Sequence, residues 1–289
     1  MLNIDLHCHS NVSDGMLSPA EVVARAASNG VDVLALTDHD DVAGLAAAQT
    51  AADAAGMTLI PGVEISVSWG GQTVHIVGLR VDPEHSGLAA GLAEIRAGRI
   101  ERARRMGDDL AKSGIAGAYE GAWGHAVNKQ MVGRTHFARW LVEQGHAPDM
   151  RGAFRRFLTR GNPGYVEHEW TSLENAVGWI GAAGGMAVIA HPGRYAFDAR
   201  RLHLLLDAFR ALGGEGIEVI TGSHHPSEYG KYADLARAFG LKASRGADFH
   251  APGEGVDIGR LPALPHYCRP VWQDWPEVTQ HPLLPVAAA

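Results

Sequence analysis

Residues 4–10 read Ile4-Asp5-Leu6-His7-Cys8-His9-Ser10, a short apolar run that ends in two histidines one residue apart. Side chains in an extended strand alternate between two faces, so His7 and His9 point the same way and Cys8 points away. Two imidazoles in this arrangement can share one cation, and histidine is the commonest metal ligand in proteins. Asp14 follows in the next loop. This stretch therefore predicts a strand whose carboxyl end carries a candidate metal site.

The same arrangement recurs along the chain, because further short apolar runs end in, or carry, histidine, aspartate or glutamate. These residues are Thr37-Asp38-His39-Asp40, Pro61-Gly62-Val63-Glu64, His75, Ala190-His191-Pro192-Gly193-Arg194 and Gly246-Ala247-Asp248-Phe249-His250. Barrel enzymes assemble their active sites at the carboxyl ends of the strands. A single histidine would more often be an ordinary hydrogen-bonded residue. Six histidines and three carboxylates in equivalent positions favour a shared site instead.

Apolar runs rich in valine, isoleucine and leucine predict strands at residues 3–6, 31–36, 58–60, 74–79, 186–190, 216–220 and 241–243. Helical patterns lie between most of these strands, at residues 19–29, 44–55, 173–183, 202–212 and 227–239. The first helix should open on a capping box at Ser18-Pro19-Ala20-Glu21. Strand–helix alternation favours a parallel α/β architecture. The exception is a predicted β-hairpin at residues 64–79, which turns at Trp69-Gly70-Gly71-Gln72.

The middle of the chain interrupts this rhythm, because it lacks a convincing strand and is rich in arginine. We expect three helical stretches there, at residues 94–113, 134–144 and 150–159. The predicted organisation is a metal-binding barrel made of residues 1–95 and 168–289, interrupted by a small helical domain at 96–167 that caps the substrate. The proline-rich stretch from Leu261 onward is predicted to be an irregular tail that packs on the surface.

Composition narrows the functional classes. The chain has 289 residues, 16 histidines and only two cysteines, which excludes a disulfide framework and a thiolate zinc site. No apolar run approaches the roughly 18–20 residues that span a bilayer, and the first residues lack a secretion signal, so we expect a cytoplasmic protein. The net charge is −7, yet residues 96–160 hold 13 Lys+Arg against 6 Asp+Glu. This basic segment indicates either a solvated helical surface or a site for an anionic substrate.

Taken together, the motifs around the histidines resemble those of the PHP (polymerase and histidinol phosphatase) family of metal-dependent phosphoesterases. The resemblance covers nearly the whole chain in order, and it implies a distorted seven-stranded TIM-like (β/α) barrel with an inserted helical domain. Within the family, the chain is most similar to the 3′,5′-nucleoside bisphosphate phosphatase and RNase AM branch. Two motifs in the predicted insertion support this, Val132-Gly133-Arg134 and Gly161-Asn162-Pro163-Gly164-Tyr165-Val166.

The resemblance also implies a cluster of three divalent metal ions. Carried over residue by residue, the ligands are His7, His9, Glu64 and Asp248 for one ion, Glu64, His75 and His191 for a second, and Asp14, His39 and His250 for a third. Oxygen and nitrogen ligands without sulfur suit manganese, iron, zinc or magnesium. We expect manganese first. Asp38 and Asp40 are predicted either to orient imidazoles or to make plain structural hydrogen bonds.

Hydrolysis of a phosphate ester is the predicted chemistry, because closely spaced divalent cations activate water and neutralise phosphate charge. Arg134 begins a predicted helix, so its guanidinium and the helix N-terminus are expected to bind the non-reacting phosphate. Lys129 is a second candidate for that role. Arg194, beside His191, is expected to touch the scissile phosphate, and His225 is a candidate hydrogen-bond donor or general acid.

Four functions are compatible with these residues. The first is a phosphatase that releases the 3′-phosphate of a small nucleotide such as adenosine 3′,5′-bisphosphate. The second is a 5′→3′ exoribonuclease acting on short 5′-phosphorylated RNA. The others are a metal-binding protein without turnover and an amidohydrolase-type enzyme. The negative net charge disfavours binding of long nucleic-acid duplexes. No membrane association or obligate protein partner is expected.

Overall fold

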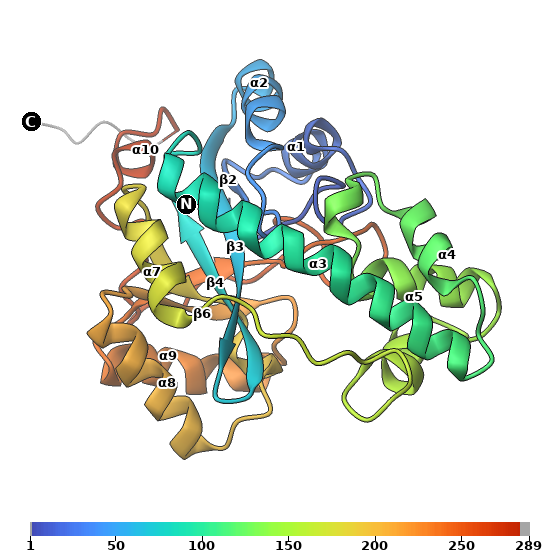
Figure 1. The fold of residues 1–289 in the computed structure, drawn as a ribbon. Helices are drawn as coiled ribbons and strands as arrows, with labels where there is room; N and C mark the ends of the chain where they lie inside the picture. Colours follow the sequence, from blue (N-terminus) through green and yellow to red (C-terminus); the bar gives the residue numbers. More distant parts are fainter. Residues whose placement is uncertain (1, 284–289) are drawn as a thin grey trace, which may run out of the picture.

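Seven strands form one sheet that curls into a barrel in the computed structural model, which describes residues 2–283 (Figure 1). Predictions that fall on residue 1 or residues 284–289 lie outside the described residues. The strands are β1 (Ile4–Asp5), β2 (Val33–Leu36), β3 (Thr58–Trp69), β4 (Gln72–Leu79), β5 (Met186–Ile189), β6 (Gly216–Thr221) and β7 (Lys242–Gly246). Neighbours in the sheet follow the order of the sequence.

The first and last strands come together and close the barrel. The backbone N–H of Leu6 donates to the carbonyl of Arg245 at 3.0 Å, and that of Asp248 donates to the carbonyl of His7 at 2.8 Å. All neighbouring strands are parallel except at β4, which runs antiparallel to both β3 and β5. The predicted distorted seven-stranded barrel is therefore confirmed, and the antiparallel β4 is its main distortion.

The antiparallel strand results from the predicted hairpin. Trp69 pairs with Gln72 across a two-residue turn, in which Gly70 and Gly71 have φ angles of 56° and 74°. A type I′ turn requires positive φ at both central positions, which glycine adopts without steric cost. The strand before the turn is longer than expected, because β3 continues beyond residues 58–60 into the hairpin.

Helices cover the outside of the barrel; four of them connect parallel strands, and α7 precedes β5. They are α1 (Pro19–Ser28), α2 (Leu45–Ala55), α7 (Leu173–Ala182), α8 (Ala199–Ala211) and α9 (Tyr229–Ala238). The capping box before α1 is confirmed, since the Ser18 side chain accepts from the backbone of Glu21 and the Glu21 side chain accepts in return. The predicted helix at 227–239 differs at its start, where a 3₁₀ turn (Pro226–Glu228) precedes α9.

The arginine-rich middle of the chain is helical. It contains α3 (Ser86–Lys112), α4 (Ala118–His125), the 3₁₀ turn η1 (Lys129–Met131), α5 (Arg134–Glu143), α6 (Met150–Ala153) and a π-helical turn (Phe154–Leu158). Sequence patterns missed α4, and the predicted helix at 150–159 is divided between α6 and the π turn. No strand is assigned between β4 and β5 in the described structure.

The long helix α3 links the barrel to the rest of the insertion (Figure 1). It begins earlier than expected and runs through the predicted boundary at 95/96. Its first half contributes Leu88, Leu92 and Ile95 to the core between barrel and outer helices. Its second half contributes Met106 and Leu110 to a separate core formed within the insertion. We retain the division into barrel and capping insertion as a proposal that agrees with this change in packing.

The chain after Leu261 differs from its prediction. It is largely irregular, with one short helix, α10 (Pro276–Thr279). However, Val271 and Trp275 are buried together with barrel residues such as Ile4 and Val188, so the prediction of a surface tail is wrong for this part. The segment closes the end of the barrel at which most strands begin. Within residues 2–283, no helix combines the length and apolar character that crossing a bilayer requires.

Candidate metal centre

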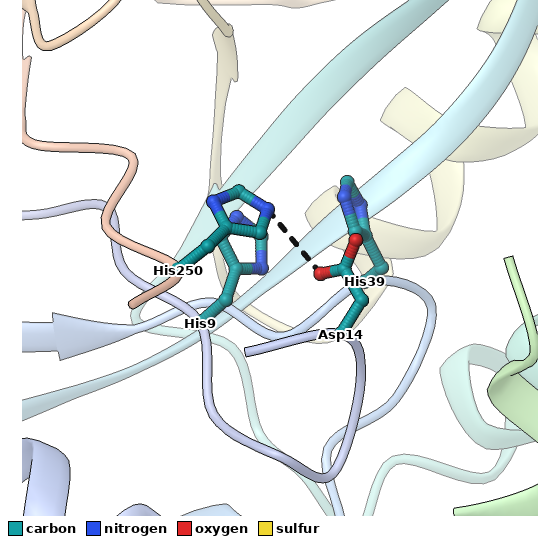
Figure 2. Close-up of side chains that lie close together, drawn as sticks. All are labelled: His9, Asp14, His39 and His250. Atoms are coloured by element: carbon teal, nitrogen blue, oxygen red, sulfur yellow. Dashed lines mark ion pairs between the residues drawn. The ribbon is translucent and has the colours of Figure 1, made fainter. Parts of the chain in front are cut away.

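The structure brings all nine predicted metal ligands together at the end of the barrel where most strands finish. Three groups have ligand atoms within 4.8 Å of one another: His7, His9, Glu64 and Asp248; His9, Asp14, His39 and His250; and His39, Glu64 and His75. His191 completes the cluster, with its Nε2 atom 2.8 Å from Glu64 Oε1. Figure 2 shows the second group, in which the rings of His9, His39 and His250 surround the Asp14 carboxylate.

Two of these groups match the predicted sets, with one addition. The group of His7, His9, Glu64 and Asp248 is identical to one predicted set. The group around Asp14 contains the predicted residues Asp14, His39 and His250 and, in addition, His9. The remaining set was expected to contain Glu64, His75 and His191. In the structure His39 also approaches Glu64, with its Nδ1 atom 3.0 Å from Oε2. The ligand sets therefore overlap more than the sequence indicated, because neighbouring strand ends lie close together.

Glu64 lies at the centre of the cluster and is fully buried. Five imidazole nitrogens approach within 3.3 Å of its carboxylate: His7 Nε2, His9 Nε2, His39 Nδ1, His75 Nδ1 and His191 Nε2. Burial alone would raise the pKa of Glu64, but electrostatic interactions with the rings of His39 and His75 hold it well below its usual value. A charged carboxylate with several lone pairs is thus available to more than one cation.

Several buried atoms of the cluster lack a hydrogen-bond partner in the described structure. They are His9 Nδ1, Asp14 Oδ1, His39 Nδ1, Glu64 Oε2, His191 Nδ1 and Asp248 Oδ1. An unsatisfied buried polar group costs about 1–3 kcal/mol, so a native cluster of them requires an explanation. Bonds to divalent cations would satisfy most of these atoms at once, and the oxygen and nitrogen donors suit such ions.

The protonation of the histidines also fits cation binding. Burial lowers the pKa of His39 to about 4 and that of His191 to about 3, so both rings are neutral and can offer a lone pair. At His9 burial is outweighed by the nearby carboxylates of Asp248 and Glu64, which raise its pKa to about 10. A divalent cation would take the place of the proton that these carboxylates attract.

A buried glutamate that sequence reasoning missed supports two of the ligands. Glu218, on β6, accepts a hydrogen bond from His7 Nδ1 at 2.8 Å through Oε1. Its Oε2 accepts from the backbone N–H of His191 at 2.6 Å. His191 has a φ of 26°, a strained value for a residue other than glycine, and this bond helps to hold it there. An isolated carboxylate within the apolar run 216–220 was the signal that could have identified Glu218.

Replacing Glu218 with alanine should weaken metal binding at the cluster by about 10- to 100-fold, the usual effect of losing a carboxylate that orients a ligating histidine. Without Glu218, the His7 ring loses the partner that fixes its tautomer. Manganese affinity measured by isothermal titration calorimetry tests this. Glu218→Gln, which retains one acceptor oxygen, should lose less affinity. Equal affinities of the wild-type protein and Glu218→Ala would show that the contact is incidental.

The aspartates on either side of His39 make structural hydrogen bonds, the second of the two predicted roles. Asp38 accepts from the backbone and hydroxyl of Ser10, at 2.7 and 2.6 Å, and from the hydroxyl of Ser13. Asp40 forms a buried ion pair with Arg99. Neither aspartate orients an imidazole in the described hydrogen bonds. They fix the loops that carry Asp14 and His39.

A cleft of about 820 Å³ opens beside the cluster. His75 and His191 lie on its wall, and five arginines line it, among them Arg102, Arg134 and Arg194. Arg194 Nη1 lies 2.9 Å from Asp248 Oδ2, so its guanidinium reaches the cluster. Burial and the charges of Arg134 and Arg99 lower the pKa of Arg102 to about 9. Such crowding of cations favours the binding of an anion.

Arg134 begins a helix, as the sequence indicated. It is the first residue of α5, and Gly133 before it serves as the N-cap. It lines both the cleft and a smaller cavity that also contains Asp14, His39 and His250. Its guanidinium lies 6.0 Å from the centre of the Phe154 ring.

Two other predicted residues are not brought to the cluster. Lys129 Nζ donates to the carbonyls of Trp123 and Ala126, both at 2.6 Å, because it lies just beyond the last turn of α4. His225 is exposed, and its ring accepts from the backbone of Ser227 at the start of the 3₁₀ turn η4 (Pro226–Glu228). Neither residue lines the cavities that contain the cluster. The neighbouring His224 lies closer, where it accepts from the N–H of Gly193 at 3.0 Å.

Several known proteins are similar to this chain in sequence and in fold. The PHP domain family matches residues 5–183. A 3′,5′-nucleoside bisphosphate phosphatase from Chromobacterium violaceum is 56% identical over 275 residues, which is 95% of this chain and 96% of that protein. A 5′-3′ exoribonuclease from Haemophilus influenzae is 43% identical over 269 residues, 93% of this chain and 97% of that protein. A solved structure from Bifidobacterium adolescentis, provisionally described as a metal-dependent phosphoesterase, has a TM-score of 0.78 at 27% identity, over 88% of this chain and 92% of that chain.

Proposed function

This chain belongs to the PHP domain family, and from that membership we propose that it is a metal-dependent phosphoesterase acting on a phosphate monoester of a small nucleotide. The reaction we favour is release of the 3′-phosphate of a nucleoside 3′,5′-bisphosphate to give the 5′-nucleotide. The observation that carries this proposal is the position of the nine-ligand cluster beside an arginine-lined cleft. The Chromobacterium violaceum relative, whose name describes this substrate class, supports it.

Three divalent ions, manganese first, are the proposed cofactors, with iron, zinc or magnesium as alternatives. The three overlapping ligand groups support this number. When bound, such ions would supply an activated water near neutral pH and neutralise the charge of the scissile phosphate. Glu64 would be shared between ions, because its two oxygens face different histidines.

The chain's own cations then place the substrate. Arg194 lies beside Asp248 and faces the cleft, so it is positioned to hold the phosphate that is cleaved. Arg134 is proposed to hold the other phosphate with the N-terminus of α5. The volume of about 820 Å³ falls in the range of small-molecule sites and has room for a nucleotide. Lys129 and His225 have no part in this proposal, because both form hydrogen bonds away from the cluster. Lys129 donates to the carbonyl of Ala126, and His225 accepts from the backbone of Ser227.

Arg134→Met should raise the KM for adenosine 3′,5′-bisphosphate by about 10- to 100-fold, since a hydrogen bond to a charged group contributes about 1.5–3 kcal/mol. Adenosine 3′-monophosphate lacks the second phosphate, so its KM should change far less. Steady-state kinetics with both substrates measure the difference. Arg155→Met, which removes an exposed arginine from the same insertion, serves as control. Equal changes for the two substrates would rule out the proposed contact.

A second candidate function is 5′→3′ exonuclease action on short 5′-phosphorylated RNA. The Haemophilus influenzae relative favours it, as does the extent of the cleft. The cleft continues past the cluster to the hairpin turn, where Arg160 and Arg201 also line it. This length can receive more than one nucleotide, and the arginines can face the phosphates of a single strand.

One experiment separates the two functions. The manganese-loaded protein is incubated in parallel with adenosine 3′,5′-bisphosphate and with a 5′-phosphorylated RNA trimer. Released phosphate and released mononucleotide are measured under the same conditions. A higher kcat/KM for the bisphosphate supports the phosphatase, and a higher value for the trimer supports the exonuclease. Turnover of neither substrate with any of several divalent metals would refute both. The cytoplasmic location and the lack of an obligate partner stay predictions.

A further inference from the structure

Two of the metal ligands sit on loops that the helical insertion holds in place. Thr135, the second residue of α5, donates a hydrogen bond from Oγ1 to Asp14 Oδ2 at 2.7 Å. The other carboxylate oxygen, Asp14 Oδ1, is buried, has no hydrogen-bond partner in the described structure, and lies 3.2 Å from His250 Nε2. The threonine therefore engages one oxygen and leaves the other directed into the ligand group.

The loop that follows β2 and carries His39 is fixed from the same side. Arg99 forms a buried ion pair with the side chain of Asp40, and Arg96 Nη1 donates to the Asp40 carbonyl at 2.7 Å. Asn128 Nδ2 donates to Asp41 Oδ2 at 3.0 Å. These three donors belong to α3 and the segment after α4. The insertion therefore binds Asp40 and Asp41, the residues that directly follow His39, through an ion pair and hydrogen bonds.

The ligands deeper in the barrel are supported differently. His7 is held by Glu218, and its carbonyl accepts from the backbone of Asp248. Glu64 exchanges backbone hydrogen bonds with the loop after β2. Among the hydrogen bonds described for residues 2–283, none joins residues 96–167 to the side chains of His7, Glu64 or Asp248. The cluster thus has one part supported by the barrel and one part supported jointly by barrel and insertion.

We propose that Thr135 is a positioning residue through which the helical insertion completes the cation position formed by Asp14, His39 and His250. This inference rests on the proposed metal centre. Thr135 restrains the Asp14 carboxylate so that Oδ1 faces the ligand group that contains His39 and His250.

Thr135→Val tests the proposal because it preserves the shape of the side chain and removes the donor. Protein freed of metal with a chelator is titrated with manganese alone, and each binding step is followed by calorimetry and by the electron paramagnetic resonance signal of free manganese. We expect one step to weaken by about 10- to 100-fold, the range for losing a hydrogen bond to a ligating group. The other steps should remain within about twofold of wild type on the same reasoning. Thr135→Ser, which keeps the hydroxyl, should restore the weakened step.

The outcomes are distinguishable. Identical binding steps in Thr135→Val and the wild-type protein would overturn the inference and leave the metal centre intact. Equal weakening of every step would also overturn it, since that points to a general loss of structure. Failure of the wild-type protein to bind manganese would instead contradict the proposed function itself. If Thr135→Val does not give the wild-type circular dichroism spectrum, Thr135→Ala is used instead, because it removes the same donor. Its manganese-binding steps are then compared with those of the wild-type protein in the same way.

Discussion

Glu64→Gln is expected to lower the rate of phosphate release by at least about 1,000-fold, or about 4 kcal/mol of transition-state stabilisation, the scale of a metal ion's charge effect. The reason is the central place of this carboxylate, which faces five imidazole nitrogens and has a strongly lowered pKa. The amide keeps the size of the side chain but removes the charge and one acceptor oxygen. Cations that share Glu64 would then lose a common ligand. Steady-state kinetics and metal content per chain measure the effect.

The control is a carboxylate of the same type away from the cluster. Glu120 is exposed on α4, and Glu120→Gln should retain wild-type activity and metal content. Circular dichroism establishes whether both variants are folded. A folded Glu64→Gln protein with near wild-type turnover would mean that the cluster does not carry the reaction.

Removal of divalent metal is expected to abolish phosphate release from the bisphosphate nucleotide. The unpaired buried atoms at Glu64, Asp248 and Asp14 indicate that the cluster is built for cations, and no other described group supplies an equivalent charge to the scissile phosphate. Dialysis against a chelator followed by phosphate assay tests this. Re-addition of manganese should restore activity, and parallel additions of iron, zinc and magnesium rank the metals.

A chelator can also inhibit directly, so a sample treated with chelator already saturated with manganese is the appropriate comparison. That sample should keep its activity. Undiminished turnover by protein verified to contain no metal would contradict the proposed chemistry. Loss of activity together with global unfolding would be recognised by circular dichroism and would show that the ions hold the barrel together.

Much of the fold and the convergence of the nine candidate ligands could be predicted because strand ends follow local rules, and the family resemblance supplied their division into ligand sets. Alternation of side chains along a strand places His7 and His9 on one face. Parallel strands then bring their carboxyl ends together, which is why Glu64 and His191 meet although 127 residues separate them. The glycine pair at the hairpin tip likewise has one favoured geometry, and β3 and β4 pair as expected.

The residues that were missed or misplaced depend on contacts that local patterns do not encode. Glu218 reaches His7 across 211 residues, and Thr135 reaches Asp14 across 121. Lys129 has a positive charge suitable for a phosphate, but its ammonium group donates hydrogen bonds to the free carbonyls at the end of α4. Trp275 lies in a proline-rich segment that resembles a surface tail, yet the open end of the barrel buries it. Each outcome was decided by packing between distant segments.

The most direct test is anomalous diffraction from crystals of the manganese-loaded protein, with data collected on both sides of the manganese absorption edge. The account predicts anomalous peaks within bonding distance of His7, Glu64, Asp248 and His191, with a further peak between Asp14, His39 and His250. Manganese peaks located only away from these side chains, in crystals of protein that releases phosphate, would contradict it.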